Sequence, residues 1–176
     1  KTIKVGICGL GTVGQGVIAL LSEGGDVLSN RVGGTIELVH VATRTPKPEV
    51  DTLGARDSRD VFDVARDPNV DVLIELIGGT TVAKELVVEA LNQGKHVVTA
   101  NKALLADHGE ELFALAESKG VALRFEAAVA GGIPVIEAVK TCLAGNHVSS
   151  VAGIINGTGN FILTEMAAKG REFSDV

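Results

Sequence analysis

The sequence predicts an α/β protein whose first part is a doubly wound parallel sheet and whose last part begins a second, α+β region. Short apolar runs rich in β-branched residues alternate with helix-length segments through the first 130 residues. A glycine-rich turn follows the first run, and a Gly-Gly-Ile-Pro sequence near residue 131 marks a change of character. Alternation at this spacing implies right-handed crossovers between parallel strands. We therefore expect one domain over residues 1–130 and the incomplete start of another over residues 131–176.

The expected elements follow from runs, caps and glycines. Residues 2–8 form a strand, residues 13–21 a helix, residues 22–35 a polar loop and residues 36–43 a second strand. The later elements, in chain order, are a helix over 61–65, a strand over 70–77, a helix to residue 92, a strand over 96–99, a helix from 107 to 119, a strand over 121–126, a helix over 131–144, a strand over 148–155 and a helix ending at residue 170.

Several polar residues are expected to cap these helices. Ser58 can cap the helix over 61–65, which Pro68 stops, and either Thr80 or Thr81 can cap the next. A capping box of Asp107 and Glu110 is expected to open the helix that follows.

The composition is that of a folded protein and argues against two kinds of partner. Of the 176 residues, 45% are hydrophobic and 22% are charged, which excludes wholesale disorder. The net charge is -6, and the chain has no Trp or Tyr to stack on bases, so we expect no nucleic-acid partner. Two uncharged stretches, residues 5–22 and 141–164, are interrupted by glycines, and we expect no membrane span.

The two cysteines, Cys8 and Cys142, lie in apolar surroundings. Neither has a second cysteine or a histidine at metal-ligand spacing. Both are therefore expected to be buried free thiols in a reducing compartment, and the protein to be cytoplasmic.

The turn after the first strand matches a phosphate-binding pattern. Gly9, Gly11 and Gly14 fit G-x-G-x-x-G between a strand and a helix. The first glycine permits the tight turn, the second lets a pyrophosphate approach the backbone, and the third lets the helix pack on the strand. The helix start at Thr12 and Val13 then presents N–H groups to the anion. We expect a Rossmann-type dinucleotide site; a glycine turn that serves packing alone is the alternative.

The end of the second strand indicates which dinucleotide is bound. An NAD enzyme usually places an acidic residue there, on the ribose 2′-hydroxyl, whereas this chain has Arg44. A guanidinium can pair with a 2′-phosphate, so NADP is expected ahead of NAD. Lys47 and Arg59 could assist, and a solvated surface arginine is the alternative.

Four further motifs, in order along the chain, resemble those of homoserine dehydrogenase. They are GGTT at residues 78–81, TANKAL at 99–104, EAAVAGGIP at 126–134 and GIINGTGNFIL at 153–163. The resemblance extends over essentially the whole chain. It implies a Rossmann-type NAD(P)-binding domain followed by the start of a substrate and dimerisation domain. Phe161 stands where a Tyr is frequent in the family, which would remove one hydroxyl.

The resemblance implies an oxidoreductase activity. The family interconverts L-aspartate 4-semialdehyde and L-homoserine with NAD(P)(H), in the biosynthesis of threonine, methionine and isoleucine. A homodimer and a small-molecule substrate are expected with it. The family's acidic substrate-binding residues and a second active-site lysine would lie beyond residue 176. We therefore expect the 176 residues alone to bind cofactor and to show negligible turnover.

The resemblance also assigns residues to the site. Lys102 becomes an active-site lysine beside the nicotinamide, able to stabilise negative charge on the substrate oxygen. Gly78 and Thr80 would line the cofactor channel, although Thr80 could equally serve as a helix cap. Substrate-side roles fall to Asn156, Gly157 and Thr158.

A monovalent cation is the other implied ligand. In the family, backbone carbonyls of a turn bind sodium or potassium, and here the corresponding residues are Glu126, Val129, Gly131 and Ile133. Main-chain oxygens suit such hard ions and require no particular side chain. A glycine turn without an ion is the alternative.

Two other interpretations of the function stay open at this point. One is a different two-domain NAD(P) oxidoreductase, such as a dihydrodipicolinate reductase or a sugar-type dehydrogenase. The sequence Asn-Lys-Ala at residues 101–103, in place of Glu-Lys-Pro, speaks against the sugar type. The other is a nucleotide-binding module without catalysis.

Overall fold

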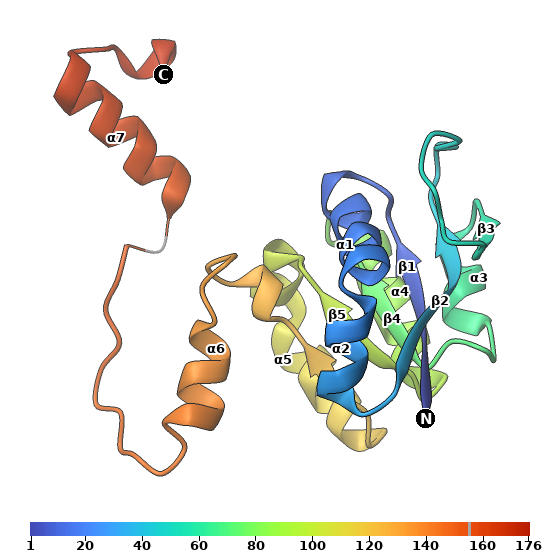
Figure 1. Cartoon of the computed structure of the whole chain (residues 1–176). Helices are drawn as coiled ribbons and strands as arrows, with labels where there is room; N and C mark the ends of the chain where they lie inside the picture. Colours follow the sequence, from blue (N-terminus) through green and yellow to red (C-terminus); the bar gives the residue numbers. More distant parts are fainter. Residues whose placement is uncertain (155) are drawn as a thin grey trace. The chain divides into compact units, whose positions relative to one another are not determined.

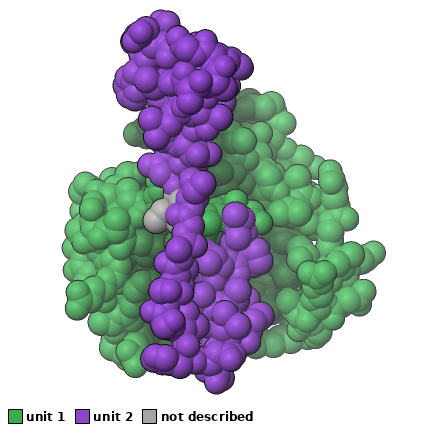
Figure 2. All heavy atoms as spheres, turned by 90° about the vertical axis from the view of Figure 1, so that its left-hand side faces the viewer, with its two compact units in different colours: residues 1–132 green, residues 133–176 purple. Residues whose placement is uncertain are grey.

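The computed structural model describes residues 1–154 and 156–176 and divides them into two compact units (Figure 2). The first unit is Lys1–Gly132 and the second is Ile133–Val176. Among the described residues, no helix is both long enough and apolar enough to cross a membrane. The assignment of a cofactor role to the first unit and a substrate role to the second stays a prediction.

A six-stranded parallel sheet forms the centre of the first unit (Figure 1). Its strands are β1 (Thr2–Cys8), β2 (Thr35–Ala42), β3 (Arg56–Ser58), β4 (Val72–Glu75), β5 (His96–Thr99) and β6 (Leu123–Arg124). Their order is β3-β2-β1-β4-β5-β6, so the direction of winding reverses between β1 and β4. This order confirms the predicted Rossmann-type, doubly wound sheet.

Helices cover both faces of this sheet, because successive side chains of a strand point to opposite faces. The helices of the first unit are α1 (Thr12–Glu23), α2 (Gly25–Val32), α3 (Val61–Arg66), α4 (Thr81–Asn92) and α5 (Lys102–Ser118). Ile7 of β1 belongs to the same core cluster as Ile18 of α1. The next residue, Cys8, belongs to the other cluster, with Leu86 of α4 and Leu104 of α5. The last two residues of β1, which precede the glycine turn, therefore belong to the two different cores.

The structure contains two elements that the sequence did not predict. They are a helix within residues 22–35, where a loop was expected, and a strand before α3. The helix α2 occupies residues 25–32, with Asp26 in its first turn and Arg31 in its last, where both complement the helix dipole. Gly33 ends α2 in the left-handed conformation, at φ 65°. The strand β3 is only three residues long and exists through its pairing with β2, in which His40 is opposite Arg56.

The caps predicted for α3 and α5 are wrong. Asp60, not Ser58, caps α3, since its carboxylate accepts a hydrogen bond of 2.9 Å from the N–H of Phe62. The helix α5 begins at Lys102, so the expected capping box of Asp107 and Glu110 lies inside it. The first N–H groups of a helix need partners from outside the helix, and at α5 the side chain of Asn101 supplies the cap, as described below.

The second unit is mainly helical among its described residues. It contains α6 (Val135–Glu137), which continues as a π-helical turn (Ala138–Cys142), then α7 (Gly157–Lys169) and a 3₁₀ turn (Phe173–Asp175). The predicted strand over 148–155 is not found: residues 148–154 have no regular structure, and residue 155 lies outside the described residues. A strand requires a neighbour to pair with, and no described residue pairs with this segment. Cys142 is exposed, which corrects the expectation of burial, whereas Cys8 is buried as expected.

Candidate cofactor and active site

A cavity of about 580 Å³ opens at the carboxyl ends of β1, β2 and β4. Its lining includes six residues that the sequence had singled out: Gly9, Gly11, Arg44, Lys47, Arg59 and Gly78. The cavity lies where the strand order reverses, which is where doubly wound folds bind their ligands.

Each of the three glycines in the turn is required for a different structural reason. Gly9 adopts φ 105°, and a Cβ there would lie 2.5 Å from the carbonyl oxygen of Leu76. A Cβ on Gly14 would collide with the carbonyl oxygen of Gly9, so α1 packs directly on the turn. At Gly11, by contrast, no described atom would lie within 4 Å of a Cβ. The missing side chain at Gly11 leaves open space in the cavity lining, which fits the approach of a pyrophosphate.

The start of α1 completes this cradle. The helix begins at Thr12 and its first turn contains no acidic residue that would repel an anion. The first N–H groups of a helix have no partner within it, and the helix dipole is positive at this end. Thr12 and Val13 therefore present donors to the turn, and this set of groups fits a dinucleotide phosphate.

Three cations line the far part of the cavity. Arg44, Lys47 and Arg59 all contribute, against one carboxylate, that of Asp60. The guanidinium of Arg59 donates from Nη1 to the carbonyl oxygen of Thr43 at 3.1 Å, which fixes it beside the end of β2. Arg44 is exposed and directly follows this residue. Arg59 is paired with Asp57 at 2.6 Å and Lys47 with Glu49 at 3.7 Å, whereas Arg44 has no ion pair among the described residues. The guanidinium of Arg44 is therefore the group that best fits a further phosphate.

A smaller cavity of about 290 Å³ adjoins the ends of β4 and β5 and contains Lys102 in its lining. The other lining residues are Val13, Glu75, Leu76, Gly78, Ala100, Asn101 and Ala103. Leu76 and Gly78 line both cavities. Lys102 is the first residue of α5 and is exposed.

Not every predicted cofactor residue contributes to these linings. The described residues that line the two cavities do not include Thr12, Gly14 or Thr80. Thr80 stands at the N-cap position of α4, yet its hydroxyl makes no cap hydrogen bond to a described residue. The expected cap function of its side chain is therefore wrong, and its role at the cofactor stays a prediction.

Glu75 is a site residue that sequence reasoning missed. It ends β4, is fully buried and lines the smaller cavity. The available signal was a carboxylate within an apolar run, since a buried carboxylate needs hydrogen-bond partners.

Burial raises the pKa of the neighbouring Cys8 thiol well above its ordinary range, and the negative charges of Glu75 and Asp60 raise it further. Cys8 is therefore an unreactive thiol.

The predicted cation ligands are divided between the two units. Glu126 begins a 3₁₀ turn, and its carbonyl oxygen accepts a hydrogen bond of 3.2 Å from the N–H of Val129. Gly131 is in the first unit, whereas Ile133 is the first residue of the second. Within residues 1–154 and 156–176, no three His, Cys, Asp or Glu side chains gather as a metal site. A site of main-chain oxygens stays a prediction.

The predicted substrate-side residues belong to the second unit. Asn156 caps α7, because its Oδ1 accepts a hydrogen bond of 2.9 Å from the N–H of Gly159. Gly157 and Thr158 form the first turn of that helix. A turn before a helix was expected at these residues, but the strand expected before it is not found.

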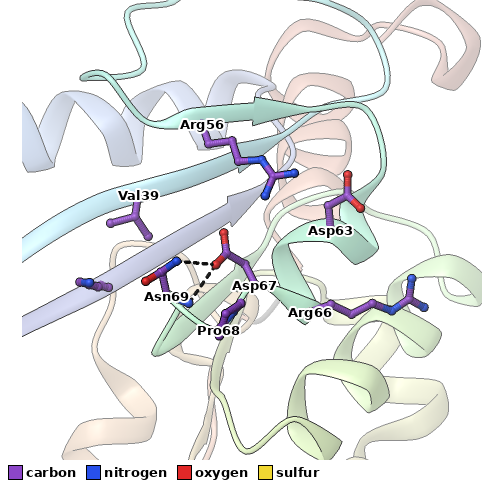
Figure 3. Close-up of a pocket in the computed structure, with 8 residues that line it drawn as sticks. Val39, Arg56, Asp63, Arg66, Asp67, Pro68 and Asn69 are labelled. Atoms are coloured by element: carbon purple, nitrogen blue, oxygen red, sulfur yellow. Dashed lines mark hydrogen bonds between the residues drawn. The ribbon is translucent and has the colours of Figure 1, made fainter.

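A third cavity, of about 530 Å³, lies at the opposite, amino edge of the sheet and contains none of the predicted residues (Figure 3). Its lining contains the carboxylates of Asp63 and Asp67 and the guanidinium groups of Arg56 and Arg66. Asp67 pairs with the buried His40 at 2.8 Å, and Arg66 pairs with Glu89 at 3.2 Å. Asp67 accepts hydrogen bonds from the backbone and side chain of Asn69, at 2.8 and 3.2 Å (Figure 3). Paired charges and internal hydrogen bonds indicate a structural role for this region.

Comparison with known protein families identifies the chain. The family model for the NAD-binding domain of homoserine dehydrogenase matches residues 9–126. The chain belongs to the homoserine dehydrogenase family. A second model, for homoserine dehydrogenase itself, matches residues 134–176. The first unit of this family member thus contains an NAD(P)-binding domain, and the resemblance found in the sequence is confirmed.

Individual homoserine dehydrogenases agree along the whole chain. One from Pseudomonas aeruginosa is 56% identical over 176 residues, and one from Neisseria gonorrhoeae is 48% identical over 177. The crystal structure of a homoserine dehydrogenase from Thiobacillus denitrificans is 48% identical, with a TM-score of 0.93 over 99% of this chain. In each case the chain spans 41% of the relative's length.

Proposed function

We propose that the protein containing this chain is a homoserine dehydrogenase that interconverts L-aspartate 4-semialdehyde and L-homoserine with NADP(H). The observation that carries this proposal is the pair of adjoining cavities at the carboxyl edge of the sheet. One holds the glycine turn and a cluster of cations, and the other holds Lys102. The names of the relatives supply the substrate class.

The choice of NADP over NAD rests on the charges at the end of β2. Residues 43–45 are Thr, Arg and Thr, so no carboxylate is available there for a ribose 2′-hydroxyl. Arg44, with Lys47 and Arg59 nearby in the lining, offers positive charge for a 2′-phosphate instead. Guanidinium groups bind phosphate in a bidentate geometry, which favours Arg44 as the main contact.

Lys102 is proposed as the catalytic group of this unit. The bound nicotinamide supplies or accepts the hydride. The ammonium of Lys102 donates a hydrogen bond to the substrate oxygen and stabilises the negative charge that develops on it. Gly78, which lines both cavities, allows close approach of the cofactor, and the Thr80 hydroxyl is available to the nicotinamide ribose. Asn156, Gly157 and Thr158 are proposed to act on the substrate side.

The remaining proposals concern ion, assembly and location. Sodium or potassium would bind main-chain carbonyls of Glu126, Val129, Gly131 and Ile133. A homodimer is supported by large apolar side chains exposed in the second unit, Ile154, Phe161 and Leu163 among them. The buried thiol of Cys8 and the biosynthetic role are in keeping with the cytoplasm.

A cofactor titration tests the proposed function. NADPH and NADH are added to the 176-residue chain and followed by their own fluorescence, because the chain has no Trp. We expect NADPH to bind more tightly, and Arg44→Ala to remove about 1.5–3 kcal/mol of that preference. Arg31→Ala, an exposed arginine on α2, is the matched control. Equal binding of the two cofactors would contradict the 2′-phosphate assignment, and binding of neither would contradict the cofactor site.

A further inference from the structure

We propose that Glu75, Thr99 and Asn101 are positioning residues that hold together the two turns bordering the smaller cavity, which contains Lys102. One turn, residues 76–79, follows β4, and the other, residues 100–101, follows β5 and leads into Lys102. This inference rests on the proposed function and adds three residues to it. It is carried by a closed circuit of hydrogen bonds among buried and half-buried groups.

The circuit begins at the buried carboxylate of Glu75. Its Oε1 accepts hydrogen bonds from the backbone N–H groups of Ile77 at 2.9 Å and Gly78 at 3.3 Å. Its Oε2 accepts a hydrogen bond of 2.6 Å from the hydroxyl of Thr99. Two groups from the first turn and one from the neighbouring strand therefore converge on one side chain.

The register of the sheet explains why these groups meet. Glu75 and Thr99 are direct partners in the parallel pairing of β4 with β5. Paired residues project to the same face of a sheet, and both side chains are fully buried there. A shift of one residue in either strand would send the two side chains to opposite faces.

The circuit continues into the second turn through Asn101. Its backbone N–H donates to the hydroxyl oxygen of Thr99 at 3.0 Å. Its side-chain Nδ2 donates to the carbonyl oxygen of Gly79 at 2.6 Å, which closes the circuit on the first turn. Its Oδ1 accepts from the N–H of Leu104 at 3.1 Å and so caps α5. Lys102 is the next residue, so its backbone is held from both sides.

The directions of these bonds make the Glu75 side chain an acceptor in each of them. The N–H of Asn101 can only donate, so the Thr99 hydroxyl accepts it and directs its own proton to Glu75. All three hydrogen bonds at Glu75 are accepted by its two carboxyl oxygens, and a fully buried side chain with three partners is held in one position. The circuit is therefore a stiff connection and not a loose set of surface contacts.

Because the circuit borders the smaller cavity, it affects the position of the cavity-lining groups as well as the stability of the fold. Glu75, Gly78, Asn101 and Lys102 all line the smaller cavity. A catalytic ammonium contributes fully only when it is held at the developing charge, and a displacement of about 1 Å can cost about 100-fold in rate. Release of either turn would move Gly78 or Lys102 relative to the other.

The test uses the full-length enzyme and two ligands, NADPH and 2′-phospho-ADP-ribose, which lacks the nicotinamide. Thr99→Val removes the hydroxyl with little change of shape, and Thr99→Ser retains it as the matched control. We expect Thr99→Val to lower kcat about 10- to 100-fold and to weaken NADPH binding, while 2′-phospho-ADP-ribose binds within about twofold of the wild type. Thr99→Ser is expected to stay close to the wild type for all three measurements.

A second variant covers the case in which Thr99→Val does not fold. Asn101→Asp keeps an oxygen to cap α5 but replaces the donor to Gly79 by an acceptor. It is expected to reproduce the loss of kcat and of NADPH affinity at the half-exposed rim of the circuit. Folded variants with unchanged kcat, or with equal loss of both ligands and a lowered Tm, would overturn the positioning role. A wild-type enzyme that neither binds NADPH nor turns over homoserine would instead overturn the proposed function itself.

Discussion

Gly9 and Gly11 are two residues apart, yet a side chain would meet different surroundings at each. A methyl group on Gly9 would press on the carbonyl oxygen of Leu76 and require a left-handed backbone. A methyl group on Gly11 would enter open space at ordinary backbone angles. The two glycines therefore separate the requirements of folding from those of binding.

This contrast gives a prediction for two single substitutions. Gly9→Ala should lower the free energy of unfolding by about 1–3 kcal/mol from backbone strain alone, with a further loss from the overlap. Gly11→Ala should cost no more than about 1 kcal/mol, the scale of an N-cap change, and yet weaken NADPH binding. Urea unfolding and cofactor titration of both variants check it. A stable Gly11→Ala variant with wild-type affinity would show that the cofactor does not approach this residue.

Asp67 predicts how acid destabilises the first unit. Burial raises the pKa of Asp67, but hydrogen bonds from Asn69 and His40 outweigh it, and the net effect lowers this pKa below its usual value. A carboxyl whose pKa is lower in the folded state stabilises that state above its unfolded pKa, about 3.9 for Asp. That contribution is lost as the pH falls through the folded pKa.

The corresponding measurement is the free energy of unfolding from neutral pH down to the acid range. The wild type should lose stability progressively below about pH 4, and Asp67→Asn should show a flatter dependence there. Asp26→Asn, at an exposed position on α2, is the control and should keep the wild-type slope. Parallel curves for Asp67→Asn and the wild type would mean that Asp67 does not govern this transition.

Among the elements, the connection between α3 and β4 is held by a lysine from outside it. The buried Lys95 precedes β5, and its Nζ donates to the carbonyl oxygens of Asp67 at 2.6 Å and Val70 at 2.8 Å. These carbonyls belong to the loop that leads into the central strand β4. A side chain that immediately precedes β5 thereby fixes the entry to the neighbouring strand β4.

Replacement of this lysine should loosen the loop. Lys95→Met preserves the length of the side chain but leaves two carbonyl oxygens without their donor, at a cost of about 1–3 kcal/mol. Lys84→Met is the matched control, because the ion pair of Lys84 with Glu111 is at the surface and contributes less than about 1 kcal/mol. Thermal unfolding of both variants checks the order. Equal losses for the two would contradict a special role for Lys95.

Local sequence patterns predicted the elements that are strongly apolar or that are stabilised by local interactions. The strands β1, β2, β4 and β5 are apolar runs, and their positions were predicted closely. The strand β3 escaped prediction because its three polar or charged residues form a strand only when β2 lies alongside. The apolar run at 148–154 shows the converse, since hydrophobicity without a described pairing partner does not make a strand.

The candidate site divides in the same way. The glycine turn, Arg44 and Lys102 belong to contiguous motifs, and the sequence alone predicts that they lie near one edge of the sheet. The bond between Glu75 and Thr99 joins residues 24 positions apart, and the bond between Asn101 and Gly79 joins residues 22 positions apart. These bonds depend on the register of β4 with β5, which no local pattern specifies.

On the scale of the whole molecule, every residue that lines the two site cavities lies within residues 1–132. A chain of residues 1–132 should therefore unfold cooperatively and bind NADPH as tightly as the 176-residue chain does, within about twofold, since no lining group is removed. Circular dichroism during urea unfolding and fluorescence titration check both parts. Loss of binding in the shorter chain would show that residues 133–176 contribute to the cofactor site.

The burial of Cys8 has a practical consequence for following the molecule in motion. The thiol is shielded at the end of β1, and burial together with the charges of Glu75 and Asp60 keeps it protonated. In a Cys142→Ser background it is the single thiol of the chain, so an alkylating reagent can modify the protein only while β1 is open. The rate of labelling then measures how often β1 opens transiently beneath the glycine turn. Slower labelling in the presence of NADPH would report cofactor binding without any optical probe.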